Sequence, residues 1–185
     1  MKLRKFNFKI VNSTNDLAIK IIKNTNNKSG IIIAEKQKKG RGQYGRKWIS
    51  FKGNLFVSIF FPIDKINLSL KDLTKINCIL VKKLLSEFYK DKISIKKPND
   101  LLINNMKISG ILQETLTKSG EKFIIVGIGV NLVKSPIIKN YLSTNFLDLT
   151  GVKINYINAI LKLKKIYEKF IPTLPKFNIN NIKKF

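Results

Sequence analysis

The order of the apolar segments constrains the fold of this chain most strongly. In its middle, β-rich segments follow one another with only tight turns between them, at Leu101–Ile103, Met106–Thr117 and Phe123–Val133. Asn104-Asn105 tolerates the positive φ angles of a type I′ turn, and Ser119-Gly120 makes the next turn. Helices interrupt the strands without a regular βαβ rhythm. The sequence therefore predicts an α+β domain with a mixed, largely antiparallel central sheet flanked by helices.

The remaining apolar segments extend this sheet and supply its helices. Further strands are predicted at Leu3–Ile10, Ile31–Ala34, Asn54–Phe61 and Lys92–Ile95. One helix is predicted to begin near Ser13 and to end in the polar run Asn24–Gly30, and others to span Ser69–Lys90, Asn140–Leu149 and Asn155–Phe170. Pro172 and Pro175 are expected to end the last helix.

Composition narrows the class of protein. Hydrophobic residues make up 44% of the 185 residues, which predicts a folded globular chain. The longest apolar stretches fall short of the roughly 18 residues that a membrane span needs, and no apolar core follows the basic N-terminus, so neither a membrane association nor a secretory signal is expected. Cys78 is the only cysteine, so an internal disulfide is impossible and a cytoplasmic location fits.

The charge pattern and the absence of histidine limit the chemistry. The net charge of +25 fits either nucleic-acid binding or a general compositional bias. Because the lysines are spread along the whole chain, we favour the bias and expect no specific nucleic-acid partner, although the charge would steer acidic partners and anionic substrates. The lack of histidine excludes Ser-His-Asp and Cys-His catalysis and most zinc sites.

The segment Gly40–Trp48 carries the most chemical information. Its glycines let the backbone approach a ligand, Arg41, Arg46 and Lys47 suit phosphate or carboxylate, and Trp48 offers a flat surface for a purine. The segment contains G-x-G-x-x-G, but a strand and not a helix is expected next, which argues against a dinucleotide-binding fold. No H-R-D or D-F-G element follows, which argues against a kinase. A solvated basic hairpin loop is the alternative.

Two further segments place polar residues beside predicted strands. Asn99 and Asp100 follow Pro98 and have oxygens suited to a hydrated magnesium ion, although an Asn-Asp pair taken alone is more often a turn. Lys107, taken alone, fits an outward-facing strand lysine. Gly127–Asn131 ends an apolar strand, where glycines indicate either a bulge or the close approach of a ligand.

Together and in order, these segments resemble the biotin protein ligase family. The resemblance covers Ser13 to about Asn131, with weaker similarity to about Phe177. It is carried by Ser13–Asn15, Ala34–Gln37, Gly40–Trp48, Asn54-Leu55, Lys96–Asp100, Lys107–Glu114 and Gly127–Asn131. The resemblance implies a fold like that of class II aminoacyl-tRNA synthetases and biotin ligases.

The resemblance also implies roles for the matching residues. The expected biotin-binding residues are Ser13, Thr14, Asn15, Gln37, Gly40, Arg41, Gln43, Lys107, Gly110, Leu112, Gly127 and Gly129. The expected ATP- and adenylate-binding residues are Arg41, Arg46, Trp48, Asn99, Lys107 and Asn131. Lys107, Arg46 and Asp100 are the expected catalytic residues, with Asp100 also the expected contact for Mg²⁺.

The implied activity joins biotin to a protein in two steps. Biotin and ATP form biotinyl-AMP, and biotin then passes to a lysine of a biotin carboxyl carrier protein, a subunit of acetyl-CoA carboxylase. The first step brings two anions together, so the site must supply positive charge and exclude water. A homodimer through sheet edges is a further expectation.

Three features depart from the family pattern. Gln43 stands where an arginine is usual, so looser retention of the adenylate is expected, and Lys97 replaces a usual tryptophan before Pro98. The chain is expected to hold a catalytic domain over residues 1–177 and a basic tail over 178–185, with no N-terminal DNA-binding domain and no C-terminal β-barrel domain.

Two other functions stay open at this point. A lipoate or octanoate protein ligase-like acyltransferase has a similar fold, and the acid that supports ATP–pyrophosphate exchange would separate it from a biotin ligase. A non-catalytic protein that binds biotin or nucleic acid would fail to label a carrier domain, and nucleic-acid binding would show a steep salt dependence.

Overall fold

A seven-stranded sheet in the order β1-β2-β3-β7-β6-β5-β4 forms the centre of the molecule in the computed structural model, which describes residues 1–138 and 142–179. Among these strands β1 and β2 run parallel, and every other neighbouring pair runs antiparallel. The predicted mixed, largely antiparallel sheet is confirmed. The strands are β1 (Arg4–Val11), β2 (Gly30–Gln37), β3 (Leu55–Pro62), β4 (Ser94–Lys96), β5 (Asp100–Ile103), β6 (Met106–Lys118) and β7 (Glu121–Val130).

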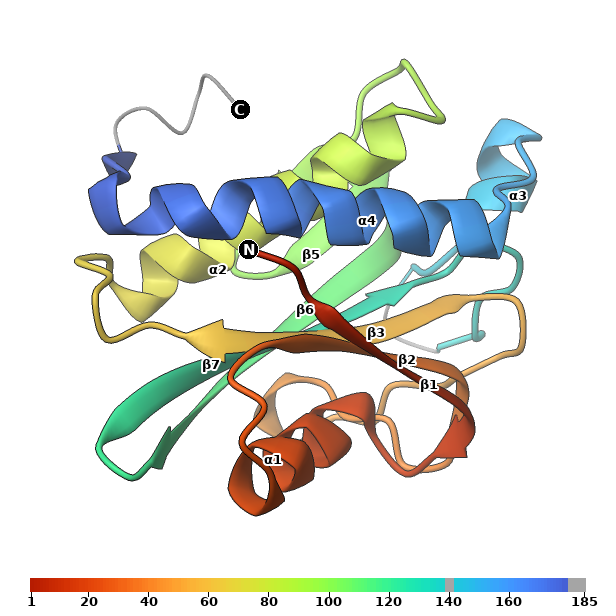
Figure 1. Ribbon diagram of the computed structural model, residues 1–185. Helices are drawn as coiled ribbons and strands as arrows, with labels where there is room; N and C mark the ends of the chain where they lie inside the picture. The colour runs from red at the N-terminus through yellow and green to blue at the C-terminus, as the bar shows by residue number, and fades with distance from the viewer. Residues whose placement is uncertain (139–141, 180–185) are drawn as a thin grey trace.

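Helices cover both faces of the sheet, with α1 on one face and α2 and α4 on the other (Figure 1). Because side chains alternate along a strand, Ile32 packs with Ala18 and Ile22 of α1, whereas Ile31 and Ile33 belong to the larger core under α2 and α4. The helices are α1 (Thr14–Asn24), α2 (Leu70–Ser86), α3 (Phe146–Thr150) and α4 (Tyr156–Phe170), with 3-10 turns η1 (Gln43–Gly45) and η2 (Ile171–Lys176).

Short-range signals fix most of the boundaries. The side chains of Ser13, Ser69, Asn145 and Asn155 each accept a hydrogen bond from the backbone N–H three residues on, and so cap the four α-helices. Asn104 and Asn105 have φ angles of 49° and 62°, and Ser119 and Gly120 have φ angles of 50° and 79°. The two predicted hairpin turns are therefore confirmed.

Two helix predictions are wrong in extent. The helix expected over Asn140–Leu149 covers only Phe146–Thr150, and residues 139–141 lie outside the described part of the chain. Instead of forming helix, Leu142 and Thr144 hydrogen-bond the backbone of Lys107, at 2.9 and 3.0 Å. The helix expected to reach Lys90 ends at Ser86. The helix predicted over Asn155–Phe170 does end at Phe170, and Pro172 and Pro175 lie in the 3-10 turn η2 that follows it.

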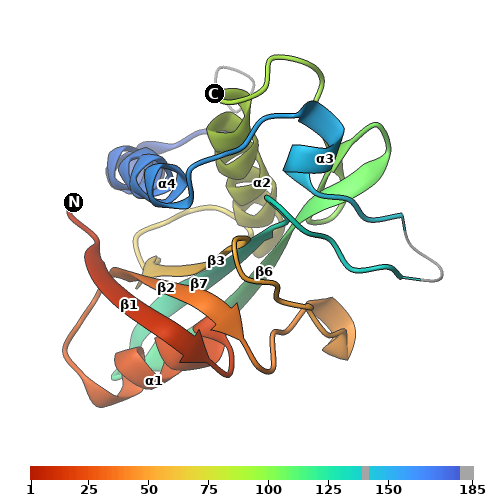
Figure 2. The same cartoon turned by 90° about the vertical axis from the view of Figure 1, so that its right-hand side faces the viewer.

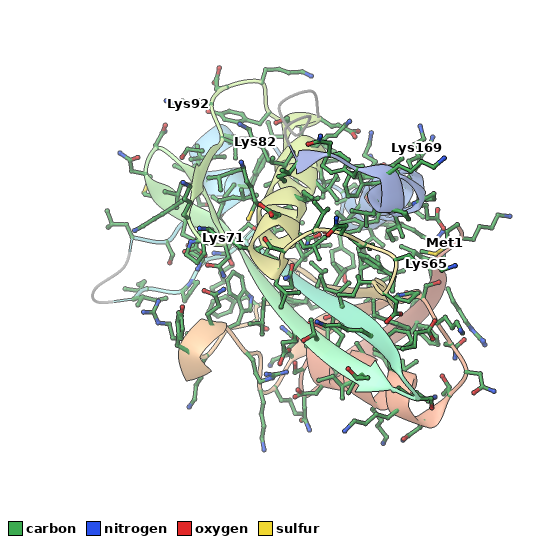
Figure 3. All side chains as sticks on the ribbon, turned by 90° about the vertical axis from the view of Figure 1, so that its left-hand side faces the viewer. Met1, Lys65, Lys71, Lys82, Lys92 and Lys169 are labelled. Atoms are coloured by element: carbon green, nitrogen blue, oxygen red, sulfur yellow. The ribbon has the colours of Figure 1, made fainter. Side chains whose placement is uncertain are left out.

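Lysines point outward on many elements. Figure 3 shows Lys71 and Lys82 on α2, Lys169 on α4, and Lys65 and Lys92 on loops, without a single stripe among them. Among residues 1–138 and 142–179, no helix combines the length and apolar character needed to cross a membrane.

Candidate active site

A cavity of about 380 Å³ lies on the face of the sheet that carries α1. The strand register makes its floor: Gly110 of β6 lies opposite Gly129 of β7, and Leu112 lies opposite Gly127. Opposed residues of antiparallel strands face the same side, so three glycines leave this part of the sheet without side chains. Because a Cβ at Gly127 would collide with the amide of Asn15 in α1, this bare patch adjoins the start of α1.

The loop between β2 and β3 forms the roof of the cavity. It closes on itself, because Trp48 N donates to Gly40 O at 2.9 Å and Gly42 N donates to Arg46 O at 2.7 Å. Figure 2 shows this loop and the segment after β7 on the same side of the molecule. The hairpin shape of the loop turns Arg46 and Trp48 toward the cavity.

The indole of Trp48 lies against the glycines of the floor. A Cβ added at Gly129 would lie 2.5 Å from the indole Cε2, and one at Gly110 would lie 2.9 Å from Cζ3. The family resemblance implies that these two glycines and Gly127 are biotin-binding residues. In the structure, Gly110 and Gly129 make room for the tryptophan ring, and Gly127 makes room for Asn15.

Lys107 faces the cavity because β6 contains an irregularity. The pairing of β5 with β6 shifts register between Leu101 and Leu102, and Ile108 and Ile111 both join the core under α2 and α4. Two residues three positions apart cannot share a face of a regular strand, so a bulge reverses the alternation and turns Lys107 to the other side. The interpretation of Lys107 as an outward-facing surface lysine is wrong.

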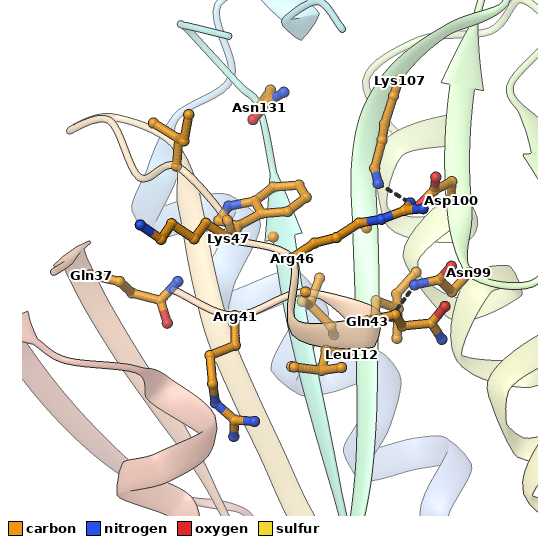
Figure 4. Close-up of a pocket in the computed structure, with 18 of the residues that line it drawn as sticks. Gln37, Arg41, Gln43, Arg46, Lys47, Asn99, Asp100, Lys107, Leu112 and Asn131 are labelled. Atoms are coloured by element: carbon orange, nitrogen blue, oxygen red, sulfur yellow. Dashed lines mark hydrogen bonds and ion pairs between the residues drawn. The ribbon is translucent and has the colours of Figure 1, made fainter. Parts of the chain in front are cut away.

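Lys107 forms an ion pair with Asp100. Its Nζ lies 2.6 Å from Asp100 Oδ1, with the side chains only 21% and 15% exposed, and 5.6 Å from the centre of a Trp48 ring. Figure 4 shows Arg46 extending from the loop toward this pair, whereas Arg41 points away from it. Two cationic side chains from separate elements therefore reach one end of the cavity.

Two buried polar atoms of residues that line the cavity have no hydrogen-bond partner among the described residues. They are Trp48 Nε1 and Asn131 Oδ1. Asn131 also donates from Nδ2 to Thr144 O at 3.1 Å, which fixes its amide. Buried polar groups in proteins are almost always paired, so an unpaired donor and an unpaired acceptor beside one cavity indicate a ligand with polar edges.

The opposite end of the cavity is lined by hydrogen-bonded polar groups from α1 and β2. Gln37 Oε1 accepts from Thr14 N and Thr14 Oγ1, at 2.8 and 3.1 Å. Beneath them, the Oγ of Ser58 lies 2.8 Å from Thr14 Oγ1 and 2.5 Å from Asn15 Oδ1. Ser58, fully buried beneath the cavity, is a supporting residue that the sequence analysis missed. Its signal is a hydroxyl in the otherwise apolar strand Leu55–Pro62.

Arg41 binds two carboxylates that the sequence analysis gave no role. Its guanidinium makes a two-pronged contact with Glu114, at 2.9 and 2.8 Å, and lies 2.7 Å from Asp16 Oδ1. The hydrogen bond with Glu114 raises the pKa of Arg41 further above its ordinary value. Asn15 Nδ2 donates to the same Glu114 carboxylate at 2.6 Å.

The site supplies few ligands for a metal ion. The described residues contain no cluster of three or more Asp, Glu, Cys or His side chains. Asp100 is the carboxylate in the cavity wall, and Lys107 already contacts it, while Asn99 Nδ2 donates to Ile111 O. The residues present fit Mg²⁺ only as an ion that takes most of its ligands from phosphate and water.

All but one of the predicted site residues line this cavity. Gly40 lies in the roof, where a Cβ would come 2.5 Å from Trp48 O. The predicted residues that line the cavity are Ser13, Thr14, Asn15, Gln37, Arg41, Gln43, Arg46, Trp48, Asn99, Asp100, Lys107, Gly110, Leu112, Gly127, Gly129 and Asn131. The structure thus brings them together, and their individual roles remain predictions.

Comparison with known proteins gives the family. Residues 7–131 match the model of the biotin/lipoate A/B protein ligase family. The chain belongs to this family. It is similar to the bifunctional ligase/repressor BirA of Escherichia coli, with 32% identity over 149 residues, 79% of this chain and 46% of BirA. It is also similar to the biotin–[acetyl-CoA-carboxylase] ligase of Paracoccus denitrificans, with 32% identity over 67% of this chain and 52% of that protein.

Solved structures of biotin protein ligases share the fold. The Aquifex aeolicus enzyme in complex with biotin and ATP has a TM-score of 0.83 and 27% identity, over 98% of this chain and 75% of that one. The Leishmania major enzyme in complex with biotinyl-5-AMP has a TM-score of 0.74 and 26% identity, over 94% and 80%. The predicted fold class is confirmed. This family member spans about half the length of the curated relatives it matches.

Proposed function

We propose that this chain is an ATP-dependent biotin protein ligase, which makes biotinyl-AMP and transfers biotin to a lysine of a carrier protein. One observation carries the proposal: a single cavity has a hydrogen-bonding end at Thr14 and Gln37 and a cationic, aromatic end at Lys107, Arg46 and Trp48. The similarity to ligases whose structures hold biotin with ATP, or biotinyl-5-AMP, supports this assignment.

The two ends suit the two substrates. Biotin has a polar ring system and an apolar tail that ends in a carboxylate, so its ring fits the network of Thr14, Gln37 and Asn15, with Leu112 along the tail. ATP fits the other end, with its adenine on Trp48 and beside the amide of Asn131. The unpaired Trp48 Nε1 and Asn131 Oδ1 supply a donor and an acceptor for polar groups there.

In the first step, a biotin carboxylate oxygen attacks the α-phosphorus of ATP and pyrophosphate leaves. Negative charge concentrates between the two substrates, and the ammonium of Lys107, held by Asp100, stabilises it. Arg46 adds positive charge from the loop. Mg²⁺, when bound with ATP, would neutralise charge on the departing pyrophosphate, with Asp100 the residue placed to contact it.

In the second step, the neutral amine of the carrier lysine attacks the acyl carbon of biotinyl-AMP. An amide bond forms, AMP leaves, and the amine loses a proton to solvent. The mixed anhydride also reacts with water, so the loop over Gly40–Trp48 serves to shield it until the carrier arrives. We propose that the carrier is the biotin carboxyl carrier protein of acetyl-CoA carboxylase, in a cytoplasmic setting. A homodimer through a sheet edge remains a prediction.

The test is an ATP–pyrophosphate exchange assay with biotin, lipoate and octanoate, each with Mg²⁺, followed by transfer to a biotin carboxyl carrier domain. We expect exchange with biotin and labelling of the domain. Exchange with lipoate or octanoate alone would move the assignment to the other branch of the family. Biotin binding without exchange or labelling would leave a non-catalytic binding protein.

A further inference from the structure

The polar contacts around the biotin-ring end form a closed circuit. It starts at Gln37, at the end of β2, and returns to the chain at Arg41, four residues later in the loop. Between these two residues it passes through Thr14, Ser58, Asn15 and Glu114, each within hydrogen-bonding distance of the next. The circuit thus joins the loop to α1, β3 and β6.

Glu114 is the point where the ring end of the cavity meets the loop. Its Oε2 accepts from Asn15 Nδ2 at 2.6 Å and from Arg41 Nη2 at 2.8 Å, while its Oε1 accepts from Arg41 Nη1 at 2.9 Å. Asn15 is 2% exposed and the Glu114 side chain 26%, so these bonds are partly shielded from water. Shielded bonds to a charged group are stronger than exposed ones.

The neighbouring contacts leave Asn15 little freedom to adapt. Its Oδ1 lies 2.5 Å from Ser58 Oγ, its Nδ2 also reaches Leu112 O at 3.2 Å, and Gly127 lies directly beneath it. A displacement of the loop that moves Arg41 therefore pulls on Glu114 and Asn15, and a ligand that orients Asn15 acts on Arg41 by the same route.

We propose that Glu114 is a positioning residue that couples the biotin-ring end of the cavity to the closed position of the Gly40–Trp48 loop. This inference rests on the proposed function for its ligand, biotin. Glu114 touches neither substrate in this account. It holds Asn15 and Arg41 in one geometry. The hydrogen-bonding groups of the biotin-ring end are therefore all in place only while the Gly40–Trp48 loop is in its closed position.

The test is Glu114→Gln, which keeps the shape of the side chain. The neighbours of the Glu114 carboxylate, Asn15 Nδ2 and the Arg41 guanidinium, are all hydrogen-bond donors. A glutamine has one acceptor oxygen and one donor group, so its NH₂ group would face another donor. We expect the Kd for biotin to rise about tenfold. Trp48 is the only tryptophan, so its fluorescence reports the loop. We expect easier acrylamide quenching of Trp48 in the variant, with or without biotin.

Asp16→Asn is the matched comparison, because the Asp16 carboxylate also contacts Arg41 but its side chain is 50% exposed and lies outside the circuit. It should loosen the loop slightly and keep the Kd for biotin within about twofold. Glu114→Asp, which keeps the charge, should recover part of the binding and quenching. A general loss of stability would affect all three variants alike. A difference between them in biotin binding and Trp48 quenching therefore reports the coupling through Glu114.

Equal effects of Glu114→Gln and Asp16→Asn on biotin binding would overturn the proposal, as would unchanged Trp48 quenching in Glu114→Gln. Failure of the proposed function looks different, because the unaltered chain would then not bind biotin. The quenching comparison without ligand would still decide whether Glu114 holds the loop.

Discussion

Replacing Gly129 by alanine tests how the nucleotide end of the cavity is built. A Cβ at this position would lie 2.5 Å from both Cε2 and Cζ2 of Trp48, a separation that real Cβ atoms essentially never show. To reach ordinary contact, the indole must move off the sheet by about 1 Å. Overpacking of this kind costs about 1–3 kcal/mol when the structure cannot relax.

Here the ring can relax, because Trp48 lines the cavity and can shift into it. The cost should therefore appear in the use of ATP and much less in folding. We expect KM for ATP to rise about tenfold, equivalent to about 1.4 kcal/mol, with a smaller change in KM for biotin. The assay is biotin-dependent ATP–pyrophosphate exchange at varied ATP, with the emission of Trp48 recorded on the same samples.

Gly120→Ala is the control for backbone strain. Gly120 has a φ of 79°, and a Cβ added there would meet no atom within 4 Å, so alanine at this position lowers stability without touching Trp48. Its KM for ATP should match that of the unaltered chain. An unchanged KM for ATP and an unchanged Trp48 emission in Gly129→Ala would refute the packing of the indole on this glycine.

Three further predictions address charge. Lys107→Ala should slow adenylate formation about 10²–10³-fold in single-turnover assays, yet change the Kd for biotin only a few-fold. Gln43→Arg should lengthen the half-life of bound biotinyl-AMP, measured by gel filtration, because it adds a cation to the roof. Burial opposes a lower pKa at Glu168, but hydrogen bonds from Lys164 and the Leu3 amide prevail and lower the pKa of Glu168. Its contribution to stability is present above its ordinary pKa and lost as pH falls through the lowered one, so Glu168→Gln should reduce the fall in melting temperature on acidification.

Each of these has a contradicting result. Equal losses of biotin affinity and adenylate formation in Lys107→Ala would remove its charge-bridging role. An unchanged half-life in Gln43→Arg would show that charge at position 43 does not retain the adenylate. An acid transition in Glu168→Gln identical to that of the unaltered chain would show that this carboxylate does not govern it.

The sequence predicts well where local chemistry decides the structure. Ser13 and Ser69 cap helices because their oxygens accept from the first turn, and Asn104-Asn105 turns the chain because asparagine tolerates positive φ. The gathering of Arg46, Lys107 and Asn131 at one cavity is implied only by family resemblance, since no periodic pattern relates residues so far apart in the chain.

What the sequence does not predict depends on contacts between distant strands. The orientation of Lys107 follows from a register shift between β5 and β6. Apolar and polar residues alternate only irregularly in this part of the sequence, so a bulge cannot be recognised from it. The partner of Arg41 is likewise hidden, because Glu114 meets it from 73 residues away. The packing of Trp48 on Gly110 and Gly129 needs the antiparallel register of β6 and β7, which places the two glycines opposite each other.

The most direct test of the account is a crystal structure of this chain with biotinyl-5′-AMP. We predict that the ring system lies against Thr14 and Gln37, that the adenine lies on Trp48, and that Lys107 Nζ approaches the phosphate within about 3 Å, hydrogen-bonding distance. An adenylate whose phosphate lies far from Lys107, or an adenylate that binds outside this cavity, would contradict the claim that acid and nucleotide meet at this lysine.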